Sequence, residues 1–125
     1  MTTWDLSGTR HHVLICHGDI CLEQGGLDVA KAIRKEIAQN DADRHIHTTL
    51  TRCNGRCDDA CTVIVYPSGI WYRNVTPMLG RRIVTEHLIQ GNIDPAKVSI
   101  TFSEKTGFTL RDGARIGRPK PDRKL

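Results

Sequence analysis

Four cysteines stand in two close pairs, Cys16 with Cys21 and Cys53 with Cys57. The first pair has the spacing C-x4-C and the second C-x3-C, so each pair can reach one metal centre from a single loop. Thiolates are soft ligands, and a four-thiolate site selects zinc or an iron–sulfur cluster over magnesium or calcium. The spacing alone leaves both metals open, because structural zinc sites use cysteine pairs of similar spacing.

Two predicted strands and one helix position these cysteines. The apolar run at residues 12–16 indicates a buried strand that ends at the first pair. Residues 45–51 are rich in β-branched side chains and predict a second strand that leads to Cys53. Between the strands, apolar residues recur every three or four positions and predict a helix that buries this face. They are Leu27, Ala30, Ile33 and Ile37.

The second half of the chain predicts a hairpin followed by a helix. Residues 61–66 indicate a central strand, residues 67–69 a turn, and residues 70–75 the returning strand. A threonine and a proline begin the segment 76–91 and a glycine ends it, which is typical of a helix. Residues 98–102 indicate one more strand or an ordered arm. The order of elements predicts an α/β fold with a parallel strand pair and an antiparallel hairpin.

Length and composition favour one globular domain. The chain has 125 residues, enough for one hydrophobic core. Its apolar runs are much shorter than the roughly 18 residues of a membrane span, and the N-terminus shows no signal-peptide pattern. We therefore expect a cytoplasmic protein without a membrane partner. In that reducing compartment, paired cysteines are more often metal ligands or redox groups than structural disulfides.

The positive charge is concentrated in the C-terminal segment. From Arg111 onward there are six basic and two acidic residues, so this segment carries 6 − 2 = +4, the whole formal net charge of the chain. The remaining residues balance to zero, and we expect no nucleic-acid partner. Glycines, prolines and charges from Gly107 onward predict a flexible basic tail, which is a candidate for docking an acidic partner.

Several motifs together resemble the thioredoxin-like [2Fe-2S] ferredoxins. They are Cys16-x4-Cys21, Cys53-Asn-Gly-Arg-Cys57, Tyr66-Pro67-x-Gly69-x-Trp71-Tyr72, Val75-Thr76-Pro77 and Ile83-Val84-x-Glu86-His87-Leu88-x-x-Gly91. A related module forms the small [2Fe-2S] subunit of NADH:quinone oxidoreductase, and the short first spacing of this chain is closer to that module than to the free-standing ferredoxins.

This resemblance implies a thioredoxin-like α/β fold, with a mixed four- to five-stranded sheet and flanking helices. It also implies a [2Fe-2S] cluster held by Cys16, Cys21, Cys53 and Cys57, one-electron transfer to a redox partner protein, and a homodimer. The domain organisation that follows is an N-terminal extension (1–10), a ferredoxin domain (11–93), and a C-terminal arm with a basic flexible tail (94–125).

The remaining candidate residues have structural interpretations. Cys61 is interpreted as a small buried residue at the start of a strand, with a reserve ligand or a disulfide partner of Cys57 as the alternative. His17 is interpreted as a loop residue and His87 as a packing histidine. We expect one ring of the aromatic pair at residues 71–72 to face the core.

The chain contains no phosphate-binding loop and no nucleophile with an adjacent base, so we expect an electron carrier and not an enzyme. Three alternatives stay open. A zinc-stabilised interaction module would use the same cysteines. A thiol–disulfide oxidoreductase of this fold would need a reactive pair, and C-x3-C differs from the usual C-x-x-C. The domain could also be a [2Fe-2S] subunit docked permanently on a larger reductase.

Overall fold

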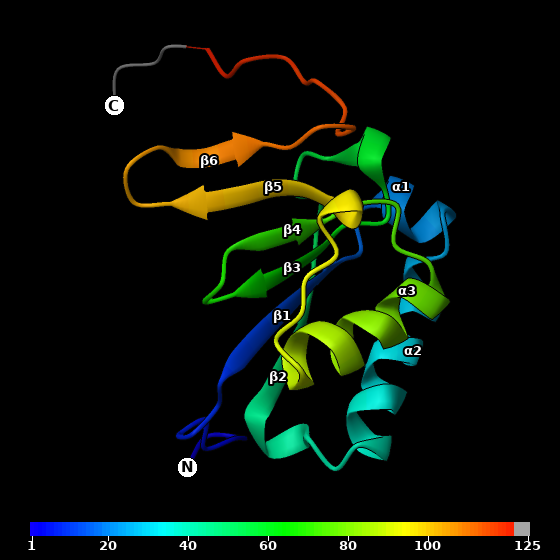
Figure 1. Cartoon of the computed structure of the whole chain (residues 1–125). Coiled ribbons are helices and arrows are strands. Elements are labelled where there is room, and N and C mark those ends of the chain that lie inside the picture. The colour runs from blue at the N-terminus through cyan, green and yellow to red at the C-terminus, as the bar shows by residue number, and fades with distance from the viewer. Residues whose placement is uncertain (122–125) are drawn as a thin grey trace.

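A six-stranded mixed sheet organises the computed structural model of the chain, which describes residues 1–121 (Figure 1). The strands follow one another across the sheet in the order β2-β1-β3-β4-β5-β6. Their bounds are β1 His11–Cys16, β2 Ile46–Thr51, β3 Val63–Tyr66, β4 Ile70–Tyr72, β5 Val98–Ser103 and β6 Gly107–Leu110. The helices are α1 Asp19–Glu23, α2 Gly26–Gln39 and α3 Pro77–Arg82, the π-helix η3 Ile83–Ile89, and the short 3-10 helices η1 Asp43–His45, η2 Cys57–Asp59 and η4 Pro95–Lys97.

The strand pairing brings the two cysteine loops to one edge of the sheet. β1 and β2 are parallel and in register, with Cys16 opposite Thr51 at their carboxyl ends. β3 runs antiparallel to β1 and to β4, so the predicted parallel pair and the predicted hairpin are both confirmed. The loop after β1 and the loop after β2 therefore leave the sheet side by side.

The main hydrophobic core lies between one face of the sheet and helices α2, α3 and η3. Alternate strand residues point into it, as expected for a sheet with one packed face. From the strands these are Val13, Ile15, Ile46, Val63, Val65, Ile70, Tyr72 and Val98. Apolar residues of the helices complete this core, and in Figure 1 both long helical segments lie on the same side of the sheet.

Helix α2 differs from its prediction in the position of its buried face. Leu27 is 52% exposed, whereas Val29 is fully buried. The buried face of the helix includes Gly26 instead of Leu27. One step along a helix turns the side chain by about 100°, so Leu27 lies outside this face. The other predicted members of the stripe are buried, as predicted, and they are Ala30, Ile33 and Ile37.

The second predicted helix is confirmed from its first residue to its end. The Thr76 hydroxyl accepts a hydrogen bond from the Leu79 N–H at 3.1 Å, and Pro77 occupies the first helical position. The α-helical turns continue into the π-helix η3 at Ile83. Gly91, with a φ of 80°, follows the last turn.

The C-terminal region differs most from the prediction. The sheet has six strands where four to five were predicted, because Gly107–Leu110, assigned to the flexible tail, forms β6. β6 pairs antiparallel with β5, from Ser103 opposite Gly107 to Ile100 opposite Leu110. Composition predicts flexibility here, whereas pairing with a strand already fixed in the sheet orders the segment. Residues 122–125 of the predicted tail lie outside the described residues.

Candidate metal centre

The four candidate cysteines lie on a strand, two short helices and a loop at the same edge of the sheet. Cys16 is the last residue of β1, and Cys21 lies in α1, a short helix that the sequence analysis did not predict. Cys53 lies in the loop after β2, and Cys57 begins the 3-10 helix η2. Cys16 and Cys21 are buried, whereas Cys53 and Cys57 are exposed. The site therefore has an inner pair and an outer pair of thiols.

The outer pair already has the spacing of two ligands on one metal. The Sγ atoms of Cys53 and Cys57 are 3.6 Å apart. Two sulfurs of a tetrahedral site with metal–sulfur bonds of about 2.3 Å lie about 3.8 Å apart. Gly55 lies between the cysteines with a φ of 81°, a backbone conformation that favours glycine, and its N–H points at the Cys53 sulfur at 3.3 Å.

The inner pair combines burial with backbone hydrogen bonds. Burial raises the pKa of the Cys16 thiol, but hydrogen bonds from the Gly18 backbone, from Asn54 and from Cys21 outweigh it and lower the pKa overall. Burial raises the pKa of Cys21 to about 12. Hydrogen bonds to the thiolate of Cys16 also stabilise the negative charge that a metal ligand must carry.

A close backbone contact joins the two loops. A Cβ atom placed on Gly18 would lie 2.8 Å from the Cα and 3.0 Å from the N of Cys53. Only glycine fits this contact, because real Cβ atoms are almost never found so close to another residue's backbone. A Cβ on Gly26 would likewise lie 2.8 Å from the Cys21 carbonyl oxygen. These two glycines allow the loop of the inner pair to lie directly against the loop of the outer pair and against α2.

The outer thiol of Cys57 is influenced by charges of both cysteine pairs. The hydrogen bond with Cys53 raises the pKa of Cys57, with smaller contributions from burial and from the negative charges of Cys53, Cys16 and Asp58. The influence of Cys16 on Cys57 crosses from one pair to the other. The loop after β2 is further fixed by Asn54, whose Nδ2 donates to the Thr51 hydroxyl at 2.7 Å.

The donor set at this edge of the sheet consists of four thiols in two pairs. A [2Fe-2S] cluster needs two thiolates on each of two irons, and the two pairs fit this requirement in number and in chemistry. Four thiolates also suit one tetrahedral zinc ion, so the donor chemistry by itself admits both metals. Within residues 1–121, no three His, Cys, Asp or Glu side chains already stand in the geometry of a bound metal ion.

Cys61 is a packing residue, as predicted. It is 2% exposed and belongs to the hydrophobic core, just before β3. Its thiol donates to the carbonyl oxygens of Cys21 at 3.3 Å and of Gln24 at 3.4 Å. Burial raises its pKa, followed by the charge of Cys16. The thiol thus binds the backbone at the C-terminal end of α1, and it points at carbonyl groups rather than at the other sulfurs.

The other candidate residues lie in structural roles. The His17 ring bonds to the Gly26 carbonyl at 2.9 Å and links the first cysteine loop to α2. His87 is 5% exposed, and its Nδ1 lies 2.7 Å from the hydroxyl of Tyr72, which itself is 2% exposed. Trp71 points to the opposite face of the sheet, where its ring meets that of Phe108 with centroids 5.6 Å apart. The interpretation of His87 and of the aromatic pair is confirmed.

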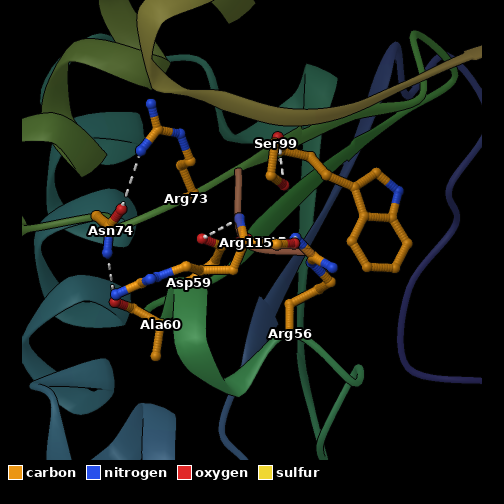
Figure 2. Close-up of polar contacts among 8 residues, drawn as sticks. Arg56, Asp59, Ala60, Arg73, Asn74, Ser99 and Arg115 are labelled. Carbon is orange, nitrogen blue, oxygen red and sulfur yellow. Dashed lines mark hydrogen bonds and ion pairs between the residues drawn. The ribbon is translucent and has the colours of Figure 1, made fainter. Parts of the chain in front are cut away.

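An ion pair that no sequence pattern predicted lies at the outer cysteines. Asp59 is 2% exposed and forms an ion pair with Arg56. Its carboxylate also accepts hydrogen bonds from the backbone N–H of Arg115, as Figure 2 shows. The positive charge of Arg56 is therefore largely balanced by Asp59. No local pattern connects Asp59 with Arg115, because 56 positions of chain separate them.

Comparisons with known proteins agree on one family. A protein of Priestia megaterium whose name places it among the 2Fe-2S ferredoxins is 54% identical over 91 residues, which are 73% of this chain and 71% of that protein. A 2Fe-2S ferredoxin of Aquifex aeolicus is 32% identical over 90 residues, 64% of this chain and 80% of that protein. No protein-family profile matches the chain.

Solved structures agree with these relatives. A thioredoxin-like [2Fe-2S] ferredoxin from Aquifex aeolicus superposes with a TM-score of 0.71 at 26% identity. The match covers 78% of this chain and 97% of that one, so this chain carries additional residues.

Among residues 1–121, no helix has the length and apolar character that a membrane crossing requires.

Proposed function

Because this chain belongs to the [2Fe-2S] ferredoxins of thioredoxin-like fold, we propose that Cys16, Cys21, Cys53 and Cys57 together hold its [2Fe-2S] cluster. The protein is an iron–sulfur electron carrier and not an enzyme, as its family requires. One observation carries the ligand assignment: two thiol pairs meet at the carboxyl ends of β1 and β2. The cluster, when bound, accepts and releases one electron at a time.

The protein's own residues hold, shield and polarise this centre. The Gly55 N–H points at the Cys53 sulfur, and the Gly18 backbone lowers the pKa of Cys16, so both stabilise negative charge on a thiolate. Burial of the inner pair keeps water away from one side of the centre. The exposed outer pair leaves the other side open, so a partner protein can approach most closely at the loop of Cys53 and Cys57.

Several finer features belong to the same proposal. We assign residues 11–93 to the ferredoxin domain, with residues 1–10 as an N-terminal extension and residues 94–125 as a C-terminal arm and tail. We propose a cytoplasmic location, because free thiols persist in a reducing compartment. We also propose that the protein transfers electrons to a redox partner protein and forms a homodimer. The zinc-stabilised module remains the competing function, and permanent docking on a larger reductase is a variant of the carrier function.

The direct test is to count iron and acid-labile sulfide in anaerobically purified protein and to record its visible spectrum. We expect about two irons and two sulfides per chain and a brown colour that dithionite bleaches. Cys57→Ser should lose or alter this spectrum. The matched control is Cys61→Ser, because Cys61 is a cysteine of the same region whose thiol bonds to backbone carbonyl groups and not to the other sulfurs. A colourless protein with one zinc, or loss of the cluster in Cys61→Ser, would contradict the assignment.

A further inference from the structure

The segment that follows β6 returns to the cysteine end of the molecule. We call residues 111–121 the strap. At its start, the Arg111 N–H donates to the Ser99 carbonyl at 2.8 Å and continues the pairing of β6 with β5. In Figure 1 the chain then reaches η2, beside the outer cysteines, before it turns back. Gly113 lies against Arg73, with its ideal Cβ position 2.6 Å from the guanidinium.

Two side chains of the cysteine loop hold the strap through its backbone. Both carboxylate oxygens of Asp59 accept a hydrogen bond from the Arg115 N–H at 3.2 Å. The guanidinium of Arg56 donates to the Arg115 carbonyl oxygen at 2.7 Å, while it also forms the ion pair with Asp59 (Figure 2). These hydrogen bonds involve only the backbone of Arg115, and its side chain is exposed. The first half of the strap is thus held through its backbone, and the Arg115 side chain is directed to solvent.

The strap carries an excess of positive charge, and its backbone is held next to η2 at Arg115. It has four basic residues and one acidic residue, which gives 4 − 1 = +3. These basic residues are exposed, and they are Arg111, Arg115, Arg118 and Lys120. Ile116, between two of the arginines, is 88% exposed. An exposed apolar side chain flanked by cations is a surface suited to a partner with an apolar pocket among carboxylates.

The strap also forms one wall of a cleft that reaches a candidate ligand. This cleft has a volume of about 180 Å³ and lies between Arg115, Ile116 and Gly117 on the strap and residues 55–59 of the cysteine loop, including Cys57. A protein that approaches the outer cysteines on this side must therefore contact the strap. All-thiolate ligation makes the centre itself negative, so an acidic partner needs a cationic rim to approach it.

We propose that the strap is a docking surface for an acidic redox partner, held beside the outer cysteines by Asp59. The proposal rests on the proposed function, because docking there matters only if the cysteines hold the redox centre. Fixing the cations in advance reduces the entropy that binding costs, which distinguishes a held strap from a free basic tail. Asp59 is then a positioning residue for the docking surface.

The first test measures whether Asp59 holds the strap, and it needs no electron transfer. Trypsin can cut the Arg115–Ile116 bond only when this part of the strap opens. In the full-length protein we expect Asp59→Asn to accelerate this cleavage at least about tenfold, since it weakens hydrogen bonds to a charged group. Asp58→Asn is the matched control, because it makes the same charge change one residue away on an exposed side chain. Equal cleavage in both variants would overturn the held strap.

The second test measures the charge that a partner meets. Reduced, cluster-loaded protein is mixed with the anionic EDTA complex of Co(III) or with the cationic hexaammine complex, and each Co(III) takes one electron to become Co(II). The strap variant replaces three cations by glutamine, namely Arg115, Arg118 and Lys120. The control variant makes the same change at three exposed cations of α2 and η1, namely Lys31, Lys35 and Arg44.

At low salt we expect the strap variant to react about fivefold more slowly than wild type with the anionic complex and faster with the cationic one. High salt should remove the difference, and the control variant should behave as wild type. Equal rates in the strap and control variants would overturn the proposal. If wild type shows no cluster spectrum, the proposed function fails instead, and the trypsin result still decides whether Asp59 holds the strap.

Discussion

Replacing Gly18 by alanine tests the contact that joins the two cysteine loops. Gly18 has φ −62° and ψ 164°, a conformation open to any residue, so alanine introduces no backbone strain. Without a steric conflict, the substitution would stabilise the protein by about 0.4–1 kcal/mol through the unfolded state. The new Cβ, however, would lie 2.8 Å from the Cys53 Cα, and the neighbour is backbone that cannot rotate away.

The size of the effect follows from this distance. Ordinary contacts begin at 3.4 Å, so an unstrained contact requires the two loops to separate by 3.4 − 2.8 = 0.6 Å. Overpacking of this kind costs about 1–3 kcal/mol. The movement also exceeds the roughly 0.2 Å within which metal–ligand distances hold. We therefore expect Gly18→Ala to lower both the unfolding free energy and the amount of cluster per chain.

The assay combines urea unfolding, followed by circular dichroism, with the ratio of visible to protein absorbance after anaerobic purification. Gly117→Ala is the matched control, since a Cβ there meets only Arg56 at an ordinary 3.8 Å. We expect that control to keep its cluster and its unfolding midpoint within error. If Gly18→Ala holds as much cluster as wild type and unfolds at the same or a higher urea concentration, the reasoning about this contact is refuted.

Two further predictions concern the helical side of the fold. Burial lowers the pKa of His87, with a smaller contribution from His11, so the folded state favours the neutral ring. The stability that the neutral ring contributes is present above the unfolded pKa of about 6.5 and is lost as the pH falls through the folded pKa. The urea midpoint should therefore decrease less between neutral and acidic pH in His87→Gln than in wild type. An equal decrease in both proteins would contradict this. Thr76→Ala removes the hydroxyl that caps α3 through Leu79 and should cost about 1 kcal/mol in the same unfolding assay, whereas Thr76→Ser should restore most of it.

Local patterns were sufficient for much of the fold. The strands that lead to Cys16 and Cys53, the helix between them and the capped helix after Thr76 each depend on side-chain periodicity or on a terminal signal within one segment. The predicted burial of Leu27 was wrong, because helical periodicity defines an apolar stripe but not which of two adjacent stripes packs against the sheet. The strand at Gly107–Leu110 was missed because composition reports propensity, whereas a neighbouring strand supplied its hydrogen bonds.

The sequence by itself limited the candidate site to a soft metal centre with thiolate ligands, because ligand type and loop spacing are local properties of the cysteine pairs. Only the tertiary structure decided how the two cysteine loops are held against each other. The contact of Gly18 with Cys53 and the bond of Asp59 to Arg115 join residues 35 and 56 positions apart, as 53 − 18 and 115 − 59 show. Such contacts arise when packed elements bring distant backbone together, so no pattern within one segment can encode them.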